Sequence, residues 1–151
     1  MKFVWSILLL AAFTVNAEVI EAEKGELDPA GAKIEENKDA SGGRLVRMVG
    51  KYVMKPEAVK TDAPGLTVPF KIAAEGKYEI KLTVFAATSS SDSVYLQIDQ
   101  GKIEPKPTGF PKKGEAVSVG KYDLSAGDHV LRFFCREPSF GIDKIEIEAV
   151  R

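Results

Sequence analysis

Short runs in which apolar and polar residues alternate are the feature that most limits how this chain can fold. Successive side chains of a β-strand point to opposite faces, so a period of two is typical of a half-buried strand. No long stretch has the 3.6-residue period of a helix, and only residues 55–60 are expected to form a short helical turn. Alternating runs occupy residues 20–23, 66–72, 78–84, 94–98, 117–119, 131–135 and 145–149.

Turn-forming residues separate these runs. Pairs and triplets rich in Gly, Pro, Asp and Ser favour chain reversal between strands. About seven to nine short strands joined by such turns predict an all-β fold, an antiparallel β-sandwich. The turn signals are Asp28-Pro29, Ser41-Gly42-Gly43, Ala63-Pro64-Gly65, Glu75-Gly76, Gln100-Gly101, Lys113-Gly114 and Ala126-Gly127-Asp128.

The N-terminus has a different composition. Lys2 precedes an apolar run from Phe3 to Phe13, and Val15 and Ala17 fit the −3 and −1 positions of a cleavage site. This order predicts a secretory signal peptide over residues 1–17, with cleavage near Ala17. The run is shorter than the roughly 20 apolar residues of a membrane span. The prediction is a single domain over residues 18–151, secreted to the periplasm or the exterior; the alternative is a buried N-terminal strand.

Charge and reactive residues limit the function further. The 151 residues carry 21 Lys plus Arg and 22 Asp plus Glu, so no basic excess favours a nucleic-acid partner. Cys135 is the single cysteine, and strand parity points it into the core. His129 is the single histidine, and we expect it to cap a turn or strand edge. No pair of carboxylates has the spacing of an acid and a base. The chain is therefore expected to lack catalytic activity. We also expect it to be a monomer.

Four segments together resemble a known family. In order they are Glu21-Ala22-Glu23, Ala40-Ser41-Gly42-Gly43, Leu124-Ser125-Ala126-Gly127-Asp128-His129 and Gly141-Ile142-Asp143-Lys144-Ile145. They resemble the motifs of carbohydrate-binding modules of families 6 and 35, which share a galactose-binding-like, jelly-roll β-sandwich. Residues 89–96 and Arg136-Glu137 are similar to a secreted bacterial subgroup of these modules.

The resemblance implies a structural Ca²⁺ held by Glu21, Glu23 and Asp143, with a backbone carbonyl near Gly43 or Arg44 as a further ligand. Residues two apart on a strand leave one face roughly 7 Å apart at the backbone, so both glutamates could reach one ion. Calcium takes six to eight oxygen ligands. The alternative is a charged strand on which a glutamate pairs with a lysine.

The resemblance also implies a sugar site on loops. Thr108-Gly109-Phe110 stands where the family has a T-G-G-W segment, and Tyr52 is the candidate for an opposing aromatic. Gly141 stands where the family often has an Asn that binds sugar hydroxyls. The expected ligand-binding residues are Tyr52, Asp92, Ser93, Phe110, Arg136 and Glu137.

Alternatives remain for these residues. Arg136 could bind a carboxylate with two parallel hydrogen bonds, which would favour an acidic glycan such as a uronate. It could equally brace the loops by pairing with Asp92 or Glu137. Phe110 and Tyr52 could anchor loops, and we expect Phe134, which lies between two arginines on an outer face, to be covered by a loop.

The sequence thus predicts a secreted, non-catalytic module that binds a polysaccharide and carries a structural calcium ion. The alternative is a structural or protein-interaction sandwich of an extracellular or envelope assembly that has lost sugar binding. The absence of Trp after residue 17 and Gly141 both favour that alternative. A third option is an accessory subunit of a separately encoded polysaccharide-active enzyme.

Overall fold

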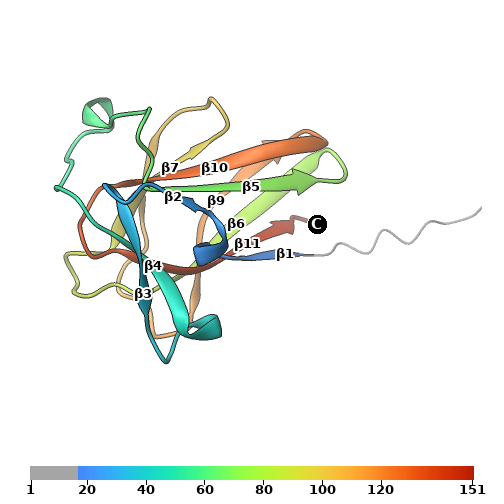
Figure 1. Ribbon diagram of the computed structural model, residues 1–151. Coiled ribbons are helices and arrows are strands. Elements are labelled where there is room, and N and C mark those ends of the chain that lie inside the picture. The colour runs from blue at the N-terminus through green and yellow to red at the C-terminus, as the bar shows by residue number, and fades with distance from the viewer. Residues whose placement is uncertain (1–16) are drawn as a thin grey trace, which may run out of the picture.

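The computed structural model describes residues 17–151, which form two antiparallel sheets packed face to face (Figure 1). The predicted signal peptide lies almost wholly outside the described residues. The first sheet has the order β3-β4-β11-β6-β9, with β1 paired to β11, and the second has the order β2-β5-β10-β7-β8. No helix of the described part is both long and apolar enough to cross a membrane.

The first sheet consists of β1 (Glu18–Glu21), β3 (Ala32–Glu36), β4 (Arg44–Met48), β6 (Gly76–Val84), β9 (Ala116–Leu124) and β11 (Gly141–Ala149). The second consists of β2 (Glu26–Leu27), β5 (Leu66–Ile72), β7 (Ser93–Ile98), β8 (Glu104–Pro107) and β10 (Gly127–Cys135). Three short 3₁₀ turns complete the fold: η1 (Ala22–Lys24), η2 (Ser41–Gly43) and η3 (Pro56–Ala58).

The predicted antiparallel sandwich is confirmed, and its core consists of the inward residues of the alternating runs. Leu66, Val68, Phe70 and Ile72 of β5 are buried, and the residues between them are exposed or half-buried. The described chain has more strands than the sequence suggests, because the alternating runs do not mark β2, β3, β4 and β8.

The first strand ends at Glu21, so the prediction that Glu21 and Glu23 point from the same face of one strand is wrong. The chain leaves β1 at Glu21 and turns through η1, so Glu21 and Glu23 do not extend from one strand face. The fully buried side chain of Ala22 and the hydrogen bond from Gly25 N to Ala22 O (3.0 Å) fix this turn. It carries the chain from the first sheet, in β1, to the second, in β2.

Phe134, Cys135 and His129 all lie where the sequence predicts them. Phe134 is buried, so it offers no exposed aromatic face. Cys135 packs against the core, and burial raises the pKa of its thiol to about 11. A thiol with so high a pKa is a poor nucleophile at neutral pH.

His129 connects two turns at one end of the sandwich. Its Nδ1 lies 2.7 Å from Asp99 Oδ2, its Nε2 lies 2.8 Å from Ser125 O, and its ring stacks on Phe70. Both partners are acceptors, so the geometry favours the doubly protonated ring. The hydrogen bond to Ser125 O, and then the bond to Asp99, raise the pKa of His129 above its usual value.

A native pKa above the unfolded value means that His129 stabilises the fold fully below about pH 6.5. This contribution is lost as the pH rises through the native pKa. We expect His129→Gln to lower the melting temperature more at pH 5 than at pH 9, as measured by thermal denaturation at both pH values. Equal losses at the two pH values would contradict the assignment.

Candidate functional site

Ser41 joins two of the predicted metal ligands. Its backbone N–H donates to both carboxylate oxygens of Asp143 (3.0 and 3.1 Å), and its hydroxyl donates to Glu21 Oε1 (2.8 Å). A Cβ placed on Gly42, next in the chain, would lie 3.6 Å from Glu23 Oε1. The structure therefore brings Glu21, Glu23 and Asp143 together around η2, and Ser41 is the contact that sequence reasoning missed.

The position of Asp143 follows from an irregularity in β11. The pairing of β11 with β6 shifts register between Ile142 and Lys144, so Asp143 has no partner residue in β6. A bulge of this kind redirects a side chain. Asp143 is only 2% exposed although it is ionisable.

The electrostatics of this acidic cluster are unfavourable as they stand. Burial, followed by the nearby charges of Glu21 and Glu23, raises the pKa of Asp143, and the Ser41 N–H partly offsets this. Glu21 Oε2 and Glu23 Oε2 are buried without a hydrogen-bond partner, and neither glutamate forms an ion pair within residues 17–151. Buried carboxylate oxygens need a partner or a cation.

The residues fit an oxygen-ligated divalent ion chemically, because three carboxylates and a hydroxyl are the donors that calcium prefers. However, the three carboxylates do not converge on one point in the structure. Within the described residues, no three His, Cys, Asp or Glu side chains are placed to hold a metal ion together. Binding would require the glutamates to turn toward a common point.

A second group of predicted residues meets around Glu137, in the loop between β10 and β11. Glu137 Oε2 accepts hydrogen bonds from Asp92 N (3.0 Å) and Ser93 Oγ (2.7 Å), and Oε1 lies 3.3 Å from Arg136 Nη1. Arg136 also donates to Ser93 Oγ. The sequence left open whether Arg136 binds a ligand or braces the loops by pairing with Asp92 or Glu137. In the structure it pairs with Glu137, which is the loop brace.

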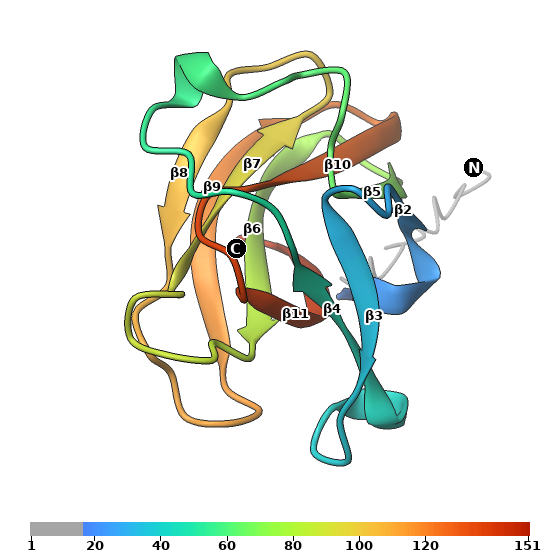
Figure 2. The same cartoon turned by 60° about the vertical axis from the view of Figure 1, so that its left-hand side comes forward.

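Tyr52 lies against this brace in the loop between β4 and β5. The Arg136 guanidinium carbon is 5.9 Å from the centre of its ring, and 51% of Tyr52 is exposed. Val53 N donates to Arg136 O (2.9 Å), and the buried Tyr95 hydroxyl donates to Val53 O (3.0 Å). Figures 1 and 2 show this loop and the loop between β10 and β11 at the same end of the sandwich.

Phe110 is attached to the same group through Thr108. The backbone N and Oγ1 of Thr108 both donate to Asp92 O, at 2.8 and 2.9 Å. Phe110, two residues further on, is 63% exposed, and Met54 is 68% exposed. Sequence reasoning missed Tyr95 and Met54. Thr108 itself could have indicated that this segment is attached to a neighbouring loop by its side chain.

Gly141, at the family's Asn position, has no room for a side chain. A Cβ there would lie 2.5 Å from Phe85 O and 2.7 Å from Arg47 Nη1. Arg47 fills the space, donating to Phe85 O, to Ser139 O (2.8 Å) and to the Glu35 carboxylate. A structural arginine therefore replaces the polar side chain that the resemblance would place here.

Comparisons with known proteins agree with this architecture at the level of fold. No family model and no curated protein sequence matches the chain. Among solved structures, a family 35 carbohydrate-binding module from Clostridium thermocellum has a TM-score of 0.63 at 20% identity, over 87% of this chain and 98% of that one. The module CBM6cm-2 of Cellvibrio mixtus lichenase 5A, in complex with cellotriose, has a TM-score of 0.63 at 18% identity, over 89% and 98%.

The chain has the fold of the carbohydrate-binding modules of families 6 and 35. A Podospora anserina GH26-CBM35 β-(1,4)-mannanase also matches, with a TM-score of 0.71 at 15% identity over 89% of this chain. This chain spans only 28% of that enzyme, and 28–29% of the matched exo-β-1,3-galactanase chains of Phanerochaete chrysosporium.

The brace can be tested through stability. We expect Glu137→Ala to lower the free energy of unfolding by about 1–3 kcal/mol, because the Asp92 N–H and the Ser93 hydroxyl lose their acceptor. Urea denaturation would measure the loss. Glu57→Ala, at an exposed position of η3, is the matched control, with an expected change within about 0.5 kcal/mol. Equal effects of the two variants would refute the brace.

Proposed function

We propose that this chain is a non-catalytic module that binds a polysaccharide on the loops around Tyr52 and Phe110. The supporting observation is that two exposed aromatic side chains are carried on loops tied to one polar framework, in a protein with the fold of carbohydrate-binding modules. Aromatic surface with a few well-placed polar groups is the usual composition of a small-ligand site.

In this mechanism the exposed faces of Phe110 and Tyr52 contact the C–H surfaces of sugar rings. Ser93 is buried and holds the loops together with Glu137, and the half-buried side chains of Asp92 and Arg136 would offer hydrogen bonds to hydroxyls. Because Glu137 already orders three of these groups, little loop freedom is lost on binding. Met54, which is exposed in the same loop as Tyr52, extends the apolar surface.

A neutral glycan fits this framework better than an acidic one, because the Glu137 carboxylate balances the Arg136 charge. The acidic glycan remains the second candidate. Lys112 follows Phe110 closely in the chain and is exposed, so it could pair with a uronate, whereas Lys113 is already paired with Asp39.

We also propose that the acidic cluster holds a structural calcium ion. Glu21, Glu23 and Asp143 would be its ligands, with the Ser41 hydroxyl nearby. The ion would neutralise the buried carboxylate oxygens and join η1, η2 and β11. The two glutamate oxygens without partners and the raised pKa of Asp143 support the proposal.

Export completes the proposal. Residues 1–17 would act as a signal peptide, and the mature module would work as an extracellular or periplasmic monomer. The matched Podospora anserina mannanase is a GH26-CBM35 protein, and this combination of a catalytic part with a module supports a partnership between this chain and a separately encoded polysaccharide-active enzyme.

The glycan site is tested with Phe110→Ala, using binding to a glycan panel that includes acidic polysaccharides. We expect affinity to fall about tenfold or more with an unchanged melting temperature, because the exposed ring carries contact area but little packing. Ile34→Ala removes a comparably exposed apolar side chain from β3 and is expected to bind like the wild type.

Wild-type affinity in Phe110→Ala would move the site away from this loop. A folded wild-type protein that binds nothing on the panel would overturn the sugar proposal and favour the structural or protein-interaction module.

The metal site is tested by melting the protein with calcium and with EDTA. A ligand that binds only the folded state adds about 2.7 kcal/mol at a concentration one hundred times its Kd. We expect calcium to raise the wild-type melting temperature and to leave Glu23→Gln unchanged. Glu26→Gln, at an exposed position of β2, should respond like the wild type. If the melting temperature of the wild-type protein is the same with calcium and with EDTA, the calcium site is refuted.

A further inference from the structure

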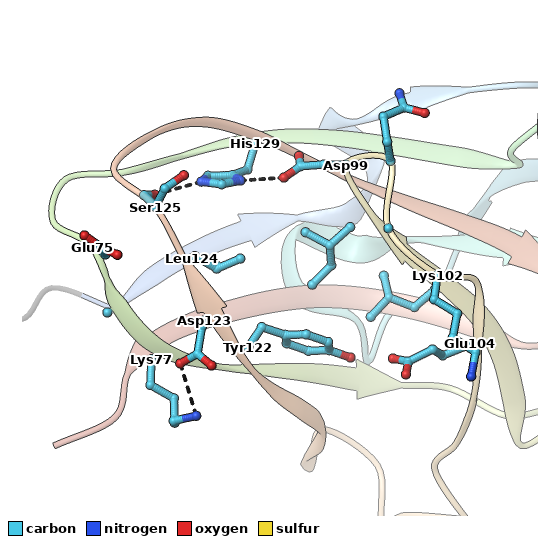
Figure 3. Close-up of a pocket in the computed structure, with 15 residues that line it drawn as sticks. Glu75, Lys77, Asp99, Lys102, Glu104, Tyr122, Asp123, Leu124, Ser125 and His129 are labelled. Carbon is cyan, nitrogen blue, oxygen red and sulfur yellow. Dashed lines mark hydrogen bonds and ion pairs between the residues drawn. The ribbon is translucent and has the colours of Figure 1, made fainter.

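The two sheets do not close over each other along one side of the sandwich. Here β8 is the edge of one sheet and β9 is the edge of the other. β8 pairs with β7 only over Ser93–Leu96, so Ile98 has no neighbour in β8. The result is a cavity of about 890 Å³ that opens between the edges (Figure 3).

The floor of this edge groove is apolar. It is lined by Leu96 and Ile98 from β7 and by Tyr122 and Leu124 from β9, all of which pack on the hydrophobic core. These side chains are mostly aliphatic. The only ring among them, that of Tyr122, has the Lys106 ammonium 5.3 Å from its centre, and its hydroxyl donates to Val119 O (3.2 Å).

Most charges of the rim are already paired. Asp99 is bound to His129, and Lys77 lies 3.1 Å from Asp123. Glu104 lies 2.9 Å from Lys106, which adjoins the groove through the Tyr122 ring.

Within the described chain, Lys102 and Glu75 are the lining residues with a charge but no ion pair. Figure 3 shows them at opposite ends of the opening, with Glu104 beside Lys102. The end with Lys102, Lys106 and Glu104 therefore has a net charge of +1.

We propose that the edge groove binds an amphipathic monocarboxylate with a hydrocarbon body of medium length. The body lies mainly on the half-buried side chains of Ile98 and Tyr122, next to the buried Leu96 and Leu124, and the carboxylate pairs with Lys102. A neutral sugar fits less well, because the carboxylates of Asp123 and Glu104 are engaged and no free aromatic face is offered. The proposal is independent of the glycan site.

The test is a titration of the ¹³C-methyl-labelled protein with sodium octanoate, followed by NMR. We expect saturable shifts of the Leu96, Ile98 and Leu124 methyl groups, and weaker binding of 1-octanol, which has the same body without the charge. Lys102→Glu should weaken octanoate binding about three- to tenfold, the range of one partly shielded ion pair, and leave 1-octanol binding unchanged.

Lys71→Glu, at an exposed position of β5 outside the groove, is the matched control and should bind octanoate like the wild type. Shifts confined to other methyl groups, equal binding of octanoate and 1-octanol, or equal affinities of Lys102→Glu and the wild type would each overturn the proposal. Phe110→Ala should bind octanoate normally, so failure of the glycan site and failure of the groove are separate results.

Discussion

The pairing of β11 with three other strands is the interaction on which the rest of the structure depends. β11 bonds to β1, β4 and β6, so it joins both ends of the chain to the middle of the first sheet. Its bulge turns Asp143 toward η2, and its first residue, Gly141, packs against Phe85 O and Arg47. The loop that enters it carries Glu137. The acidic cluster and the Glu137 brace therefore both lie at the start of this one strand.

The two groups treat buried charge differently. Around Glu137, each oxygen of a mostly buried carboxylate has a donor, and the positive partner comes from the adjacent residue, Arg136. Such a closed network fixes loop geometry more than it adds stability. Around Asp143, three carboxylates approach with only Ser41 as donor, and two oxygens have no partner. In the first arrangement only Arg136 Nε is buried without a partner, and the opposite charges balance; in the second, the atoms without partners belong to carboxylates, whose charges no basic side chain balances by an ion pair within residues 17–151.

Much of the fold could be predicted because alternation is a local property. The inward residues of β5 and β10 can be read from their own runs, with no knowledge of the partner strands. The two site groups required the resemblance, since Glu21 and Asp143 are distant in the sequence. Three features could not be predicted. They are the turn at η1, the bulge in β11, and the lack of room for any side chain at residue 141, where Arg47 fills the space. Each depends on contacts with another strand or loop, such as Arg47 with Phe85 O, that no local pattern encodes.

The edges of the two sheets are protected against pairing with other strands. An open edge invites pairing with another chain, and the edges formed by β2, β8, β3 and β9 are blunted. β2 is two residues long, β8 contains Pro105 and Pro107, β3 carries exposed charges, and β9 is broken by a register shift opposite Ile80 and Lys81. These devices disfavour strand addition between copies. The chain turns after Ile98, where Gly101 N donates to Ile98 O, and β8 begins only at Glu104, so Ile98 has no neighbour in β8. The edge groove therefore follows from where β8 begins, whereas Pro105 and Pro107 protect the strand itself against pairing with another chain.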